Sequence, residues 1–117
     1  MTRGDEQRLD DIREMCAAAA ALVARGRPAL DSDEILWLAL ERAVEIAGEA
    51  ATQLSDAEKD RFPNLSWREL VGTRVVLAHA YHRVDHDLLW GIAVNDLPAV
   101  AHALGPLPDP AEARSPE

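Results

Sequence analysis

Three residues that lie close together in the sequence, Arg74, His79 and Tyr81, could act jointly on a phosphate ester. The guanidinium of an arginine holds a phosphate while negative charge builds on its oxygens. A histidine gives and takes protons near neutral pH, and a tyrosine adds a phenol. An arginine and a histidine together suffice to cleave RNA through attack of its own 2′-hydroxyl group, a reaction that requires no metal ion. The residue types therefore predict a metal-free phosphodiester cleavage site.

The spacing of these residues constrains how the site can be built. On a straight helix, at about 100° per residue, Arg74 and Tyr81 share one stripe, but His79 points roughly 140° away from Arg74. Such a helix cannot aim both side chains at one phosphate. Either the helix ends or distorts near His79, or two copies of the chain meet across a two-fold axis and complete the site together. We favour the dimer.

Charge confines any phosphate-binding surface to one part of the chain. The 117 residues include 12 Lys and Arg against 21 Asp and Glu, a net charge of −9, which excludes the broad basic surface of a typical nucleic-acid-binding protein. Residues 66–86, in contrast, hold three arginines against two carboxylates, a balance of +1, before their histidines are counted. We expect phosphate to bind there.

The elements that must position these residues are predicted to be helices in one domain. Only 4% of the residues are aromatic, and the apolar residues are mostly Ala, Leu and Val, which favours helices over strands. Apolar residues recur at spacings of three and four, the period of an amphipathic helix. The pattern predicts an all-α fold of about five helices, over residues 7–25, 35–54, 56–61, 66–81 and 85–104.

Capping and breaking residues mark the boundaries of the first three helices. Gly26 and Pro28 end the first helix. Asp31, with Glu34 three residues later, predicts a capping box at the start of the second, and Ser55 caps the third.

Similar signals bound the last two helices. Ser66 begins the fourth helix, Asp85 or Asp87 begins the fifth, and Pro98 is expected to kink or reset the fifth. We expect the domain to span residues 1–105 and the proline-rich tail, residues 106–117, to be flexible.

Longer stretches of the sequence resemble a known family. Ser66–Tyr81 reads SWRELVGTRVVLAHAY and is followed by RVD at Arg83–Asp85, LW at Leu89–Trp90 and NDLP at Asn95–Pro98. The EIAGEA stretch at residues 45–50 is similar to the same family's second helix. In order and length, roughly residues 5–105 resemble the HepT-like toxins of the HEPN superfamily.

The resemblance implies a homodimeric, up-and-down HEPN-like helical bundle that acts as a metal-independent endoribonuclease toxin without a cofactor. It also implies that Arg74 and His79 are the catalytic pair. Tyr81 would be the hydroxyl that receives AMP from a nucleotidyltransferase antitoxin of the MNT type. AMP on Tyr81 would place bulk and negative charge beside Arg74 and so repel RNA. This sequence departs from the family at Val75, where an asparagine is common.

Three further residues are candidates for supporting roles. Glu45 and Glu49, four residues apart on the second predicted helix, could orient Arg74 or the histidines, and Arg68 lies on the predicted helix of Arg74. The alternative explanation is a solvated charged face, or an ion pair of Arg74 with Glu45 or Glu49 that has no catalytic role.

The other residues that could do chemistry have a simpler explanation. His79, His82 and His86 would share a face if the fourth helix continued past Tyr81, which makes a metal site an alternative, but Asp85 predicts a new helix and we expect no metal. Cys16 and the three tryptophans lie in apolar helical stripes. We expect Cys16 in the core and the tryptophans as core and dimer anchors rather than base-stacking platforms: Trp37, Trp67 and Trp90.

A second class of function stays open from the sequence. The chain could be a non-catalytic helical partner that docks onto a nucleotidyltransferase, and Val75 and the net charge of −9 favour this alternative. The charged N-terminus and the lack of an apolar run of about 18 residues predict a cytoplasmic protein outside the membrane.

Overall fold

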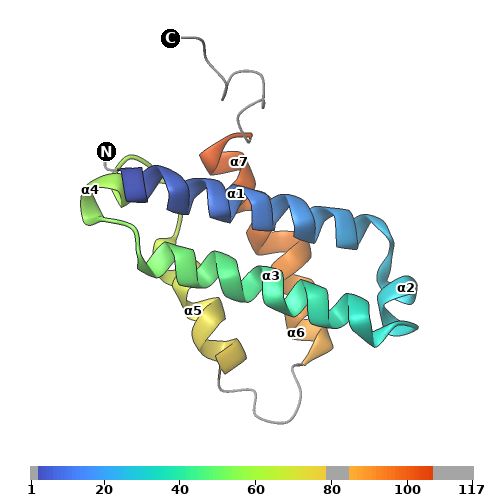
Figure 1. The fold of residues 1–117 in the computed structure, drawn as a ribbon. Coiled ribbons are helices and arrows are strands. Elements are labelled where there is room, and N and C mark those ends of the chain that lie inside the picture. The colour runs from blue at the N-terminus through green and yellow to red at the C-terminus, as the bar shows by residue number, and fades with distance from the viewer. Residues whose placement is uncertain (1–2, 79–84, 107–117) are drawn as a thin grey trace.

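Two long helices, α1 (Arg3–Ala24) and α3 (Glu34–Thr52), run side by side and antiparallel in the computed structural model (Figure 1). The structure describes residues 3–78 and 85–106. The other elements are α2 (Arg27–Asp31), α4 (Asp56–Lys59), α5 (Trp67–Ala78), α6 (His86–Gly91), a π-helical turn (Ile92–Asp96) and α7 (Leu97–Leu104).

The shorter elements pack against this pair. Helix α5 lies against α3, whereas α6, the π-helical turn and α7 follow one another in a rod that crosses α3 and α1 (Figure 1). The described residues form helices and no strand, which confirms the all-α prediction. They form more helices than the five expected, because α2 was not predicted and the fifth predicted helix divides into α6, the π-helical turn and α7.

The core lies where α1, α3 and the rod meet. Leu40 and Val44 on α3 and Ile12 on α1 are fully buried, and Leu89 and Leu97 bring the rod against them. Burying such side chains contributes roughly 1.5–3 kcal/mol each to folding. The same core includes other residues from the predicted apolar stripes: Leu9, Cys16, Ala19, Ala47, Ala50, Ala51 and Leu54.

Side-chain caps begin three helices where the sequence predicts them. The Ser55 hydroxyl accepts a hydrogen bond from the Glu58 amide at 3.2 Å, and the Ser66 hydroxyl accepts one from the Glu69 amide at 3.3 Å. The Asp85 carboxylate accepts hydrogen bonds from two amides in the first turn of α6. Each cap satisfies a donor that would otherwise lack a helical partner.

The predicted capping box at the start of the second long helix is wrong. Asp33, not Asp31, is the cap of α3, and its carboxylate accepts a hydrogen bond from the Ile35 amide at 3.0 Å. Asp31 ends α2, where it forms an exposed ion pair with Arg27. Helix α2 ends at Asp31, so this residue is not the N-cap of α3. Helix α3 begins at Glu34, two residues later than a cap at Asp31 would place its first residue.

Glycine and proline interrupt the chain as expected. Gly26 adopts a φ of +89° between α1 and α2, a conformation that favours glycine, and Gly105 adopts +81° after α7. Pro98 lies in the first turn of α7, directly after the π-helical turn, so the predicted reset at this proline is confirmed. Most of the predicted flexible tail, residues 107–117, lies outside the described residues.

Candidate functional site

Helix α5 carries the first residue of the predicted catalytic motif. Arg74 and Val75 lie in its second half, and Ala78 is its last residue. His79, Tyr81 and the side chain of Arg74 lie outside the described part of the structure. The pairing of these three side chains therefore stays a prediction.

Buried residues just before Arg74 hold α5 in place. Leu70 and Thr73 are buried against the core side of the helix, and the Thr73 hydroxyl donates a hydrogen bond to the Leu70 carbonyl at 2.7 Å. At the start of α5, the Trp67 indole donates a hydrogen bond to the Lys59 carbonyl at 3.0 Å. These contacts fix the backbone that leads into Arg74.

The helix that follows the motif in the sequence, α6, is also held against α3. The end of α5 and the beginning of α6 lie on the same side of α3 in Figure 1. His86, the first residue of α6, stacks on Trp37 of α3 with ring centroids 4.1 Å apart. The segment that includes His79 and Tyr81 is thus bounded at both ends by helices that contact α3.

The predicted supporting residues occupy exposed or half-buried positions. The Glu45 carboxylate forms an ion pair with Arg42, and the exposed Glu49 carboxylate accepts a hydrogen bond from the Thr52 hydroxyl at 3.1 Å. Arg68 is exposed on α5 and forms no ion pair with a described residue. Arg68 is therefore available to a phosphate, whereas Glu45 already has a cationic partner.

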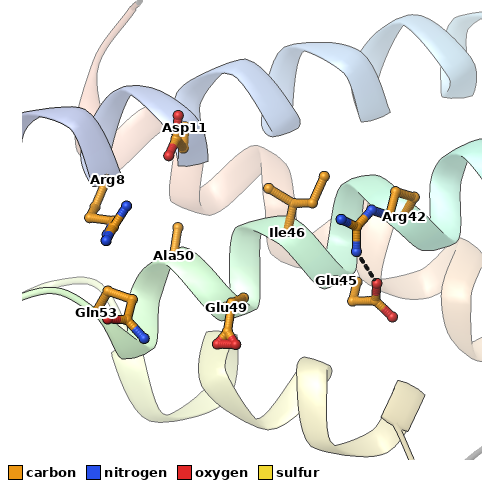
Figure 2. A pocket seen from close by; sticks show the side chains of 8 residues that line it. All are labelled: Arg8, Asp11, Arg42, Glu45, Ile46, Glu49, Ala50 and Gln53. Carbon is orange, nitrogen blue, oxygen red and sulfur yellow. Dashed lines mark hydrogen bonds and ion pairs between the residues drawn. The ribbon is translucent and has the colours of Figure 1, made fainter.

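Glu45 and Glu49 also line a groove of about 530 Å³ along α1 and α3 (Figure 2). Arg8 and Asp11 contribute to this groove from α1, and Arg42 contributes from α3. Because its charged side chains comprise two arginines and three carboxylates, the groove is not a cationic site for a polyanion. The other lining residues are Ile46, Ala50 and Gln53.

Another carboxylate on α3, that of Glu41, was not among the predicted site residues. Partial burial raises its pKa, as do the neighbouring charges of Glu45 and Glu34, while His86 lowers it. Glu34, Glu41 and Glu45 are spaced seven and four residues apart, so they follow one face of α3. That spacing was visible in the sequence, but the approach of His86 from α6 was not.

The alternative of a histidine metal site receives no support from the described residues. His86 begins α6 instead of continuing α5, and its ring packs on Trp37. His79 and His82 lie outside the described residues. No three His, Cys, Asp or Glu residues within 3–78 and 85–106 are grouped so that they could hold a metal ion.

The tryptophans and the cysteine lie in or against the core, as predicted. Trp37 is buried, and Trp67 and Trp90 are half-buried against the core cluster. Cys16 is buried, and burial raises the pKa of its thiol to about 11. The prediction that the tryptophans also anchor a dimer is not tested.

None of the helices in the described residues combines the length and apolar character needed to cross a bilayer.

Several curated relatives match this chain over part of their length. "Putative RNase MJ1380" of Methanocaldococcus jannaschii is 38% identical over 69 residues, covering 59% of this chain and 63% of the relative. "Probable ribonuclease HepT" of Thermococcus cleftensis is 37% identical over 68 residues, covering 58% of this chain and 62% of the relative. The chain thus spans about three fifths of the length of these relatives.

No solved structure matches the chain significantly. The family model described as "Ribonuclease HepT-like", however, matches residues 6–106, which include every described helix except the first turn of α1. The matched region also contains the motif of Arg74, His79 and Tyr81. The chain therefore belongs to the HepT-like ribonuclease family.

Proposed function

We propose that this protein is a metal-independent endoribonuclease and the toxin of a toxin–antitoxin pair. The observation that carries the proposal is the family match over residues 6–106, which includes Arg74 and His79 at the spacing that resembles the HepT-like toxins. The names of the relatives, which describe ribonucleases, support the same reaction.

The proposed reaction is an internal transesterification of RNA. The 2′-oxygen attacks the adjacent phosphorus, and the bond from phosphorus to the 5′-oxygen breaks. The products are a 2′,3′-cyclic phosphate and a free 5′-hydroxyl. His79 takes the proton from the 2′-hydroxyl or gives one to the leaving 5′-oxygen. Arg74 binds the phosphate and stabilises the negative charge of the transition state.

A homodimer supplies the geometry that a single helix lacks. On a straight helix Arg74 and His79 diverge by roughly 140°, so a site shared between two chains lets the arginine of one approach the histidine of the other. Two copies also supply two histidines, one for each proton transfer.

RNA contacts a locally basic surface in this proposal. The net charge of −9 repels RNA from most of the protein, whereas residues 66–86 carry a balance of +1. Arg68 is exposed on α5 and has no described carboxylate as an ion-pair partner, so it can bind a backbone phosphate next to the site. Glu45 and Glu49 would orient the site from α3.

Adenylylation would turn the enzyme off. An MNT-type nucleotidyltransferase antitoxin transfers AMP to the Tyr81 hydroxyl, two residues after His79. The added phosphate competes with RNA for Arg74 because both are anions. In this proposal the toxin and its antitoxin act in the cytoplasm.

The test is cleavage of total cellular RNA by the purified protein in EDTA. Wild-type protein should cleave RNA, while His79→Ala and protein pretreated with the nucleotidyltransferase and ATP should not. Circular dichroism and size-exclusion chromatography should show that His79→Ala stays folded with an unchanged oligomeric state. Equal cleavage by wild type and His79→Ala would refute the catalytic role of His79.

A non-catalytic partner of the nucleotidyltransferase is the second candidate, and Val75 favours it. An asparagine at this position would offer an amide donor next to Arg74, and valine cannot. Intact RNA after incubation with folded, unmodified wild-type protein would favour this candidate over the ribonuclease.

A further inference from the structure

Five side chains hold the beginning of α6 against the beginning of α3, and we name them the α6 anchor: Arg27, Trp37, His86, Asp87 and Trp90. The rings of His86 and Trp37 stack with an interplanar angle of 9° and centroids 4.1 Å apart. Trp90 meets the same indole edge to face at 6.2 Å. These contacts join α6 to α3 through aromatic surfaces.

An arginine from α2 closes the anchor from a third helix. The Arg27 guanidinium donates to the Asp87 carboxylate at 2.8 Å and lies 5.1 Å from the centre of the Trp37 ring. It also lies 6.0 Å from the Trp90 ring. The hydrogen bond to Asp87 raises the pKa of Arg27. A permanent cation thus links an α6 carboxylate to two aromatic rings.

The anchor acts at the first turn of α6. Asp85 caps this helix through the amides of Asp87 and Leu88, at 2.8 and 3.2 Å, so the turn is well defined locally. The cap alone does not decide where the turn sits in the fold. His86 contributes to its placement, because its ring packs the first helical residue onto buried Trp37.

The same first turn lies close in sequence to the proposed catalytic histidine. Helix α5 enters the motif from a position fixed by Leu70 and Thr73, and the chain re-enters the described fold at Asp85. The six residues between Ala78 and Asp85 include His79. His86 follows His79 by only seven residues, so a shift of the first turn of α6 is passed to the motif through a short covalent connection.

We propose that His86 is a positioning residue for RNA cleavage, acting through its stack on Trp37; this inference rests on the function proposed above. It assigns no proton transfer to His86. The aromatic ring, rather than the imidazole nitrogens, provides the effect, so another flat ring should replace it. Losing the stack should lower kcat because the reacting groups are aligned less often, while KM changes little because the phosphate-binding arginines remain.

The experiment compares His86→Ala and His86→Phe in the full chain with RNA cleavage as the readout. We expect His86→Ala to lower kcat about tenfold with KM within about twofold of wild type. His86→Phe should keep kcat within about twofold of wild type, because phenylalanine can still stack on Trp37. His102→Ala, which alters an exposed histidine on α7, is the matched control and should behave as wild type.

Urea unfolding of each variant separates positioning from stability, since a folded fraction near one at the assay temperature removes instability as an explanation. Asp87→Asn provides a second disruption of the anchor, at an exposed side chain, and should lower kcat about threefold by weakening the contact with Arg27. Wild-type kcat in both His86→Ala and Asp87→Asn would overturn the proposal.

Two further outcomes distinguish this proposal from the one on which it rests. If His86→Phe is as inactive as His86→Ala, the imidazole itself is needed and the positioning role is wrong, while the ribonuclease function stands. If wild-type protein fails to cleave RNA, the proposed function is wrong and a role for His86 in cleavage is overturned with it.

Discussion

The imidazole of His86 lies almost parallel to the indole of Trp37, so the first residue of α6 is packed onto a buried side chain of α3. His86 also approaches Glu34, with 3.7 Å between its Nε2 and the carboxylate oxygen. His86, one of the three histidines considered for a metal site, thus packs α6 against α3. The contact lies seven residues after His79 of the proposed motif.

Val75 is the position at which restoring the family's usual residue should increase activity. It follows Arg74 within α5. If Arg74 binds the scissile phosphate as proposed, Val75→Asn supplies an amide donor beside it, and we expect kcat for RNA cleavage to rise about tenfold, the effect of about 1.4 kcal/mol in the transition state. Val75→Leu, which offers no donor, is the control. Equal rates for the asparagine and leucine variants would contradict the role of the amide.

Two leucines on α3 test the assignment of the core. Leu40 is fully buried, whereas Leu38 is 55% exposed. Leu40→Ala should lower the free energy of unfolding by about 2–5 kcal/mol, because it removes buried methyl groups and leaves a cavity. Leu38→Ala should change it by less than about 0.5 kcal/mol. Urea unfolding followed by circular dichroism measures both, and similar losses in the two variants would show that α3 is turned differently.

The corrected start of α3 can be tested with a pair of aspartates. Asp33→Ala should cost about 1 kcal/mol of stability, since it removes the acceptor for the Ile35 amide. Asp31→Ala removes only an exposed ion pair with Arg27 and should cost less than about 0.5 kcal/mol. Thermal melts of the two variants show which aspartate caps α3. A larger loss of stability in Asp31→Ala than in Asp33→Ala would support the capping box predicted from the sequence.

The buried thiol of Cys16 should make stability depend on pH in the alkaline range. Its pKa in the folded protein is about 11, against an ordinary value of 9.0, so the folded state retains a proton that the unfolded state loses. The stabilisation is complete below about pH 9 and is lost as the pH rises towards about 11, with a slope of up to about 1.4 kcal/mol per pH unit.

The measurement for Cys16 is the difference in unfolding free energy between wild type and Cys16→Ala at several pH values. Other alkaline groups contribute equally to both proteins and cancel in this difference. Cys16→Ala should lack the additional loss of stability between about pH 9 and 11. A difference that stays constant over this range would show that the thiol is not shielded from water.

The sequence predicted those parts of the fold that depend on neighbouring residues. Ser55, Ser66 and Asp85 cap helices in the structure because a cap contacts amides only two or three residues away. Asp33 was missed since two aspartates flank Ser32, and choosing between them requires knowing that α2 is a helix. A five-residue helix is too short to produce a recognisable apolar period.

The contacts around the candidate site depended on tertiary packing. Arg27, Trp37 and His86 come from three different helices, and no local spacing indicates that they meet. The raised pKa of Glu41 likewise depends on burial, which only folding supplies, in addition to the charges of Glu45 and Glu34 on its own helix. The proposed catalytic motif could be noticed in the sequence because its residues are close together in the chain, and Arg74 is confirmed to lie on a helix.

The guanidinium of Arg13 on α1 donates a hydrogen bond at 2.8 Å to the carbonyl of Leu104, the last residue of α7. Figure 1 shows α7 crossing α1, so α1 is covered by a helix that is synthesised much later than α1 itself. A nascent chain that stops before Leu104 lacks this carbonyl and the apolar cover that α7 gives to α1. Synthesis order therefore delays the finished bundle until α7 has been made, and truncated products that lack α7 should be substrates for proteolysis rather than stably folded proteins.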